Sequence, residues 1–247
     1  MKIAVVAANG KAGRLIVKEA VDRGMDVTAV VRGENKSEAE KVLVKDAMEL
    51  TSEDLAGFDA VVDAVGAWTP DTVSAITDVA MYLADVLSGT NTRLVIVGGA
   101  GSLYVDSEHT KTVLDVTPFP EAALPVVRTH GKLLEMLRGR DDVRWTYVSP
   151  AGDFQADGER TGAYQLGGEE LILNAAGEST ISYADYAIAM VDEIESGDHI
   201  RQRISVVSKL AARRSRRFGT RGKHRTRFAR DGPCPQPAKH RIRISSV

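Results

Sequence analysis

"AANGKAG", residues 7–13, separates the apolar run "KIAVVA" from the helical pattern "RLIVKEAVDRG". Gly10 and Gly13 lie at this junction between an expected strand and an expected helix. A helix N-terminus attracts a phosphate, and glycines there permit a tight turn and close packing of the helix on the strand. The spacing matches neither G-x-G-x-x-G nor a P-loop, so two interpretations stand: a phosphate-binding loop, or a turn required only for packing.

Apolar runs and helical patterns alternate along the chain. The runs are rich in valine and several are continuously apolar, which is typical of a parallel sheet covered on both faces. The alternation predicts an α/β fold with a doubly wound parallel sheet. We expect strands at 2–8, 26–31, 41–47, 58–65, 92–99, 143–150 and 201–207. We expect helices at 11–24, 51–57, 70–89, 121–140 and 182–197, and a small C-terminal lobe of loops and short strands after residue 150.

The composition bounds the class of protein. The chain has 247 residues, of which 43% are hydrophobic, enough for one domain with a buried core. No apolar run reaches the length of about 18 residues that a membrane-spanning helix needs, and we expect no signal peptide before the first strand. The one cysteine, Cys234, excludes a disulfide framework and fits a reducing cytoplasm.

The charge changes sign near the C-terminal end. Residues 1–207 hold 19 Lys and Arg against 33 Asp and Glu, a net charge of −14, whereas residues 208–247 hold 13 against one, a net charge of +12. We therefore expect a globular domain over 1–207 and a basic, disordered tail over 208–247. Three origins of the tail stay open: a frame-shifted or read-through terminus, an arm without specific function, and an arm that binds nucleic acid through its phosphates.

The second expected strand ends at Arg32, with Lys36 nearby and no acid before Glu34. In a dinucleotide-binding sheet, an acid at this point binds the ribose 2′-hydroxyl of NAD(H), whereas an arginine accommodates the 2′-phosphate of NADP(H). Arg32 therefore favours NADP(H), with NAD(H) as the alternative cofactor. The alternative for the residue itself is a solvated surface arginine.

Several short motifs then follow in a characteristic order. "AANGKAGR", "VVR", "KDA", "DAVGA" and "VIVGGAGSL" together resemble an atypical short-chain dehydrogenase/reductase. The stretch from Thr129 to Tyr164 is similar to the NADPH-dependent flavin reductase/biliverdin-IXβ reductase group and to NmrA-like NAD(P)H-binding proteins. The resemblance covers residues 1–207 and implies an NAD(P)-binding Rossmann fold.

The resemblance also implies cofactor contacts. Ala7 departs from the pattern, because it stands where the family has its first glycine. No metal site is expected. The implied pyrophosphate contacts are Asn9, Gly10, Lys11, Ala12, Gly13 and Arg14. The remaining contacts are Arg32 at the 2′-phosphate, Asp46 and Ala47 at the adenine, Ala64, Val65 and Gly66 at the ribose, and Pro150 and Ala151 at the nicotinamide carboxamide.

Catalytic residues are less apparent. Short-chain dehydrogenases use a Tyr-x-x-x-Lys pair as proton donor, but here Arg128 occupies the tyrosine position before Lys132. Alcohol or ketone chemistry by that route is therefore not expected. Ser102, which the family places near the nicotinamide, is the catalytic candidate, while Tyr104 and His130 are interpreted as a loop aromatic and a structural histidine. The expected acceptor pocket is lined by Ala67, Trp68, Ser102, Leu103, Phe154 and Tyr164.

The sequence thus predicts an oxidoreductase that transfers hydride from NADPH to a flavin, a quinone or a similar conjugated small-molecule acceptor. Two alternatives remain: a non-catalytic NmrA-like redox sensor that acts through a partner protein, and an NAD(P)-dependent epimerase/dehydratase. The helical patterns at 70–88 and 126–139 could either pair between the subunits of a homodimer or cover the sheet.

Overall fold

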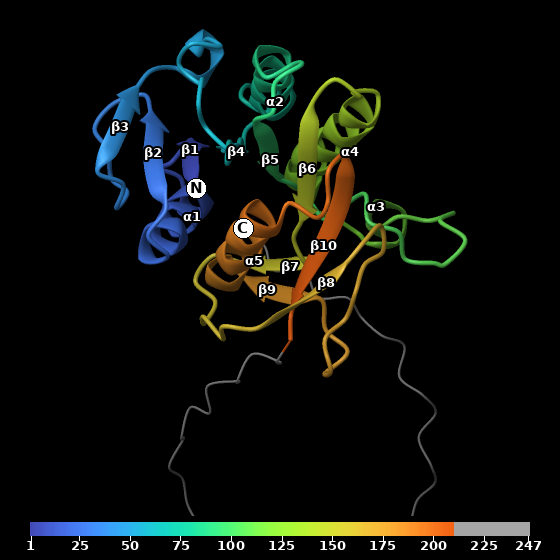
Figure 1. The fold of residues 1–247 in the computed structure, drawn as a ribbon. Coiled ribbons are helices and arrows are strands. Elements are labelled where there is room, and N and C mark those ends of the chain that lie inside the picture. Colours follow the sequence, from blue (N-terminus) through green and yellow to red (C-terminus); the bar gives the residue numbers. More distant parts are fainter. Residues whose placement is uncertain (210–247) are drawn as a thin grey trace, which may run out of the picture.

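The computed structural model describes residues 1–209 (Figure 1). One eight-stranded sheet crosses the molecule in the order β3-β2-β1-β4-β5-β6-β10-β8. Its strands pair in parallel, except that β8 runs antiparallel to β10. The strands are β1 (Lys2–Val6), β2 (Asp26–Val31), β3 (Lys41–Val44), β4 (Ala60–Asp63), β5 (Arg93–Val97), β6 (Arg144–Ser149), β8 (Tyr164–Gly167) and β10 (Gln202–Ser208). The predicted doubly wound α/β fold is confirmed.

Helices cover both faces of this sheet (Figure 1). Helices α1 (Lys11–Asp22) and α5 (Tyr183–Ser196) pack together on one face, and α2 (Ala75–Val86) and α4 (Leu124–Arg138) pack together on the other. Side chains of successive β1 residues point to opposite faces of the sheet. Ile3 packs in the core beneath α1 and α5, and Ala4 packs in the core beneath α2 and α4. Because both sides of each strand are buried, the strands read as continuous apolar runs.

Five short elements lie between the longer strands and helices of residues 1–209. The C-terminal lobe contains a two-stranded parallel sheet in which β7 pairs with β9. These short elements are η1 (Ala47–Glu49), α3 (Val113–Val116), η2 (Glu121–Ala123), β7 (Asp153–Gln155) and β9 (Thr180–Ser182). The lobe is not separate from the main sheet, since β8 hydrogen-bonds to β10.

The helix predicted at 51–57 is wrong, because this segment forms only turns. Thr51 and Asp54 close one turn on themselves: the Asp54 N–H donates to Thr51 Oγ1 at 3.2 Å, and the Thr51 N–H donates to Asp54 Oδ2 at 2.8 Å. Gly57, the last residue of this segment, has a φ of 76°, a left-handed conformation that does not continue a helix. Helix α2 also begins at Ala75, later than predicted, after a run of turns.

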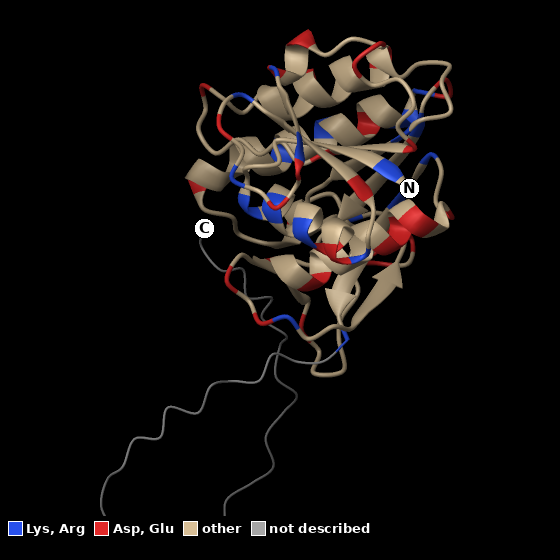
Figure 2. Ribbon diagram, turned by 60° about the vertical axis from the view of Figure 1, so that its left-hand side comes forward, with Lys and Arg blue, Asp and Glu red and all other residues tan. Residues whose placement is uncertain are grey.

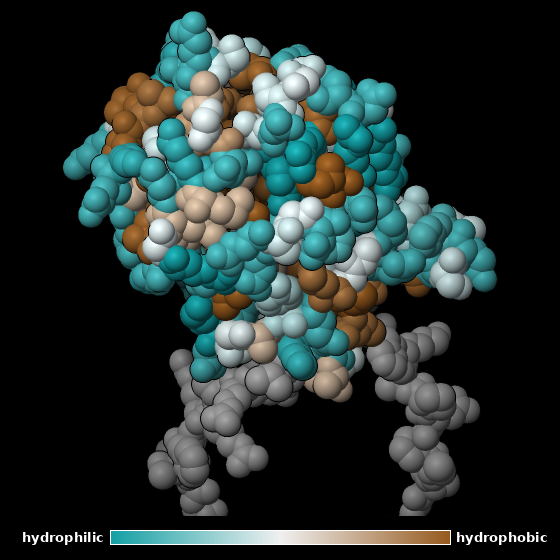
Figure 3. Space-filling model, in the orientation of Figure 1, coloured by the Kyte–Doolittle hydropathy of each residue, from teal (hydrophilic) through white to brown (hydrophobic). Residues whose placement is uncertain are grey.

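Basic and acidic residues are distributed over the helices and loops (Figure 2). Arg23, after the end of α1, donates to Asp192 Oδ1 and Glu195 Oε2 of α5, each at 2.6 Å, and thereby joins the two helices on this face. Hydrophilic residues separate the hydrophobic areas on the face shown in Figure 3. Within residues 1–209, no helix has the length and hydropathy to cross a membrane. The predicted tail lies outside the described residues apart from Ser208 and Lys209.

Candidate functional site

The carboxyl ends of the central parallel strands meet at one edge of the sheet. The strand order places β2 and β3 on one side of β1 and places β4, β5 and β6 on the other. The loop after β1 therefore lies at the point where the direction of the strand order reverses. Open α/β sheets bind their ligands at such a switch point.

Backbone geometry explains the glycines of the β1–α1 loop. Ala7 adopts a left-handed φ of 58°, and its carbonyl accepts a hydrogen bond from the Gly10 N–H at 2.9 Å. A Cβ on Gly13 would lie 2.5 Å from the Ala7 carbonyl oxygen, so only glycine lets α1 approach the loop this closely. The left-handed turn at Ala7 also explains why a glycine suits this position in the family pattern.

The N-terminus of α1 fits a negatively charged group. Gly10 is the N-cap and supplies no side-chain cap, and the first turn contains no acidic residue. Lys11 and Arg14 are exposed on the same turn. Uncapped N–H groups at a helix N-terminus, together with nearby cations, favour a phosphate. The residues present here therefore fit the diphosphate of a dinucleotide.

Asn9 braces this loop against the segment after β2. Its Nδ2 donates to the Glu34 carbonyl at 2.8 Å, and its Oδ1 accepts from the Lys36 N–H at 2.7 Å. Arg32 lies just before this segment and is exposed; within residues 1–209 it makes no hydrogen bond or ion pair through its side chain. Arg32, the predicted 2′-phosphate residue, thus follows β2 close to the segment that Asn9 ties to the β1–α1 loop. Its exposed guanidinium is accessible to a ligand.

The predicted adenine and ribose residues follow β3 and β4. The Asp46 carboxylate accepts from the Met48 N–H at 2.9 Å and caps η1, while Ala47 is partly buried in the core beneath α2 and α4. The Ala64 N–H donates to the Val6 carbonyl at 3.2 Å, which ties the end of β4 to that of β1. Gly66 is exposed and lies beside the indole of Trp68.

Asp63 lies at the end of β4 and is not among the site residues predicted from the sequence. It is 3% exposed, and one carboxylate oxygen accepts from the Val65 N–H at 3.0 Å. Burial raises the pKa of Asp63 to about 7. The signal for it was the second of the two acids in "DAVVDAV", residues 59–65, which directly follows the apolar stretch "AVV".

An open cavity of about 160 Å³ lies beyond the ends of β5 and β6. Its walls include the loop 98–101, the loop 150–152 and the aromatic side chains of Trp68, Phe119, Phe154 and Tyr183. Pro150 and Ala151, the predicted carboxamide contacts, are part of this lining. No residue of the lining is an acid, a lysine or an arginine, so the cavity is apolar and uncharged.

The predicted pocket lining is only partly confirmed. Trp68 and Phe154 line the cavity, but Ala67 and Leu103 are buried in the core and Ser102 lies outside the lining. Tyr164 is wrong as a lining residue, because it lies on β8 and its hydroxyl donates to Asp192 Oδ2 at 2.6 Å. These stretches are apolar throughout, so their sequence shows no alternation of polar and apolar residues. It therefore could not indicate which side chains face the cavity and which face the core.

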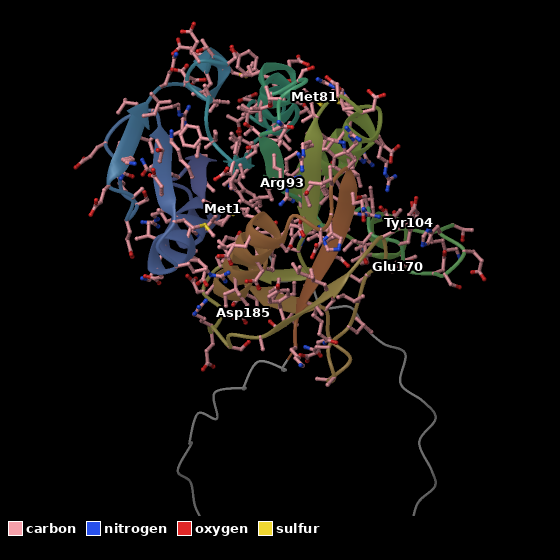
Figure 4. All side chains as sticks on the ribbon, viewed as in Figure 1. Met1, Met81, Arg93, Tyr104, Glu170 and Asp185 are labelled. Atoms are coloured by element: carbon pink, nitrogen blue, oxygen red, sulfur yellow. The ribbon has the colours of Figure 1, made fainter. Side chains whose placement is uncertain are left out.

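Ser102 faces a buried arginine. Nη1 of Arg203 donates to Ser102 Oγ at 3.0 Å and to the Ser102 carbonyl at 2.8 Å, and the Arg203 side chain is inaccessible to solvent. The catalytic role of Ser102 stays a prediction. Tyr104 stacks on His109 with ring centroids 4.3 Å apart, and its N–H donates to the carbonyl of Glu169. Figure 4 shows Tyr104 close to Glu170, in agreement with its interpretation as a loop aromatic.

His130 lies in the cavity wall, which the sequence analysis did not expect. Its ring packs on Gly99, where an added Cβ would lie 2.9 Å from His130 Cβ and Cγ. The Tyr147 hydroxyl accepts from the Gly99 N–H at 2.9 Å and lies 3.2 Å from both Nδ1 and the carbonyl oxygen of His130. Burial lowers the pKa of His130 to about 4, so the imidazole is neutral at physiological pH.

A doubly wound sheet with a glycine-bounded, uncapped helix at its switch point defines a dinucleotide-binding protein. The sequence model of the NAD(P)H-binding family matches residues 7–196, and the chain belongs to this family. Within residues 1–209, no cluster of three or more His, Cys, Asp or Glu could hold a metal ion.

Relatives and solved structures agree with this assignment. The chain is 45% identical over 212 residues to YwnB of Bacillus subtilis, a protein of uncharacterised function, covering 85% of this chain and 99% of YwnB. It is 53% identical to a Streptococcus pneumoniae protein described as a proposed NADH-flavin reductase, with a TM-score of 0.82 over 85% of this chain and 100% of the other. It is 35% identical to a proposed epimerase from Bacteroides thetaiotaomicron, with a TM-score of 0.74 over 85% and 98% of the two chains.

Proposed function

We propose that this protein is an NAD(P)H-dependent reductase whose acceptor is a planar conjugated molecule such as a flavin. The observation that carries the proposal is the uncharged, aromatic-lined cavity next to Pro150 and Ala151. Cavities of this kind bind apolar ring systems, and a few polar groups fix the orientation of the ring. The Streptococcus pneumoniae relative, described as a proposed NADH-flavin reductase, supports the same class of acceptor.

The chemistry divides between cofactor and protein. A bound nicotinamide would supply a hydride, that is, two electrons and one hydrogen nucleus, and the acceptor would take up one further proton from solvent. The chain contributes binding and orientation: the α1 N-terminus holds the diphosphate, and the aromatic walls place the acceptor ring against the nicotinamide. A conjugated acceptor of this kind does not require the proton donor that the missing Tyr-x-x-x-Lys pair would provide.

The cavity favours this function over the epimerase alternative suggested by the Bacteroides thetaiotaomicron relative. A sugar substrate would need several polar side chains for its hydroxyl groups. The lining provides only three side chains with polar atoms, those of Trp68, His130 and Tyr183. Leaving sugar hydroxyls without partners in such a site is unfavourable.

We further propose NADPH as the preferred cofactor, on the basis of the exposed guanidinium of Arg32. Arg32→Ala should weaken NADPH binding by about 10- to 100-fold, because a charge-assisted contact to the 2′-phosphate is lost. NADH lacks that phosphate, so its dissociation constant should change less than about threefold. Fluorescence titration with each cofactor measures the two changes, and an equal loss for both would remove the 2′-phosphate role from Arg32.

The proposed activity is tested by following NADPH oxidation at its absorbance maximum, first with the protein alone and then with FMN or menadione added. We expect oxidation that depends on both protein and acceptor. Binding of NADPH without oxidation by either acceptor would contradict the reductase proposal and favour the redox-sensor alternative.

A further inference from the structure

The cavity holds few polar side-chain atoms. They are the indole N–H of Trp68, the hydroxyl of Tyr183 and the imidazole of His130. Trp68 is 60% exposed at the rim, so its N–H is accessible to water. His130 differs from these two residues, because the Tyr147 hydroxyl contacts both its Nδ1 and its carbonyl oxygen.

The contacts of Tyr147 determine which nitrogen of His130 carries the proton. The phenol has one proton, and its contact with the His130 carbonyl at 3.2 Å requires that it donate, because a carbonyl only accepts. Its contact with Nδ1, also 3.2 Å, then has the Nδ1–H as donor and the phenol oxygen as acceptor. The phenol oxygen accepts a second bond from the Gly99 N–H.

In a neutral imidazole, a proton on Nδ1 leaves a lone pair on Nε2. Within residues 1–209, Nε2 of His130 has no hydrogen-bond partner, and it does not belong to the fully buried side-chain atoms that lack one. Nε2 therefore keeps some exposed surface, and His130 is part of the cavity lining. The low pKa of His130 agrees with a ring that keeps this lone pair at physiological pH.

We propose that Nε2 of His130 accepts a hydrogen bond from a ring N–H of the electron acceptor, so that the site selects N–H-bearing heterocycles over quinones. The inference rests on the proposed function and specifies its acceptor. A flavin presents an imide N–H at N3, whereas a quinone ring presents only carbonyl acceptors. In an apolar cavity, an acceptor atom left without its donor costs binding energy, so the preference is measurable.

Two flavins that differ by one hydrogen-bond donor test this selection. Lumiflavin carries the N3–H, and 3-methyllumiflavin replaces it with a methyl group. Binding of each to the full chain saturated with NADP⁺ is followed by quenching of flavin fluorescence. We expect lumiflavin to bind about tenfold more tightly than its methylated analogue to the unaltered protein.

Variants separate the hydrogen bond from the shape of the cavity. His130→Leu should bring the ratio of the two dissociation constants close to one, whereas His130→Gln keeps a carbonyl acceptor and should retain part of the preference. Tyr147→Phe leaves His130 in place but removes the contact that fixes its tautomer, and it should also lower the ratio. Trp68→Leu is the control, since it should weaken both flavins equally. NADPH affinity and the urea midpoint verify that each variant is folded.

The outcomes separate this inference from the proposed function. Equal binding of the two flavins to the unaltered protein, binding of neither, or a preference that survives His130→Leu would overturn the role of His130. Flavin binding with the expected ratio, but without NADPH oxidation, would contradict the reductase proposal and leave the His130 site supported. Oxidation of NADPH with equal use of both flavins would support the reductase proposal and overturn the role of His130.

Discussion

At Ala7 one residue shows how backbone geometry and sequence pattern meet. A left-handed φ of 58° costs a residue with a side chain about 1 kcal/mol. The turn is nevertheless formed, because the Ala7 carbonyl accepts from Gly10 and the absent side chain of Gly13 leaves room for it. The glycine spacing and the departure at Ala7 could be read from the sequence, whereas the left-handed conformation of that alanine could not.

Asp63 should make stability depend on pH. Its pKa of about 7 in the folded protein lies above the ordinary 3.8, so the folded state disfavours the carboxylate, and stability falls as pH rises between these values. The full loss is about 4 kcal/mol at most. Asp63→Asn keeps the acceptor for the Val65 N–H without the charge. Urea unfolding should show a larger gain for Asp63→Asn at pH 8 than at pH 5; an equal gain at both would contradict the burial of an ionisable carboxyl.

Ser102→Ala distinguishes the two roles of Ser102. Arg203 would keep its bond to the Ser102 carbonyl but lose the hydroxyl acceptor, so we expect a loss of about 1–2 kcal/mol in the free energy of unfolding. The predicted catalytic role requires in addition that turnover of NADPH with FMN falls while NADPH affinity changes little. A loss of stability with unchanged turnover would show that Ser102 acts only through its contact with Arg203.

At the scale of elements, the loop after β5 illustrates why glycine-rich sequence need not mean phosphate binding. A Cβ on Gly98 would lie 2.4 Å from Cε1 of Tyr147 on β6, and one on Gly101 would lie 2.2 Å from Cγ1 of Val127 on α4. These glycines let the loop pass between a strand and a helix that follow it in the chain. The sequence predicted the strand and the helix but not their contact with this loop.

Gly13→Ala tests the packing of α1 against the β1–α1 loop. The new methyl group would meet the Ala7 carbonyl oxygen at 2.5 Å, so the loop or the helix must shift. We expect a loss of about 1–3 kcal/mol in the free energy of unfolding, and NADPH affinity should fall by at least about tenfold because the diphosphate site is displaced. Gly168→Ala is the matched control, since its Cβ would approach nothing closer than 4.0 Å. Similar effects of the two substitutions would refute the close approach.

At the scale of the whole molecule, the sequence predicted the layers better than the site. Valine-rich runs identified the parallel strands, because each strand is buried on both faces. The cavity instead combines Trp68, His130, Phe154 and Tyr183, which come from different elements and share no local motif. His130 was interpreted as structural for this reason. Its position in a helix did not indicate that its ring packs on Gly99 and contacts Tyr147 in the wall of the cavity. The homodimer, the tail and the separate cofactor roles stay predictions.

The dinucleotide site that we propose at the switch point of the sheet is built on "AANGKAG". The most direct test is a fluorescence titration of the full chain with NADPH and, separately, with NADH. We expect saturable binding at one site per chain, with NADPH the tighter ligand. Absence of saturable binding for both cofactors would contradict it, and would mean that Gly10 and Gly13 serve only to pack α1 against β1.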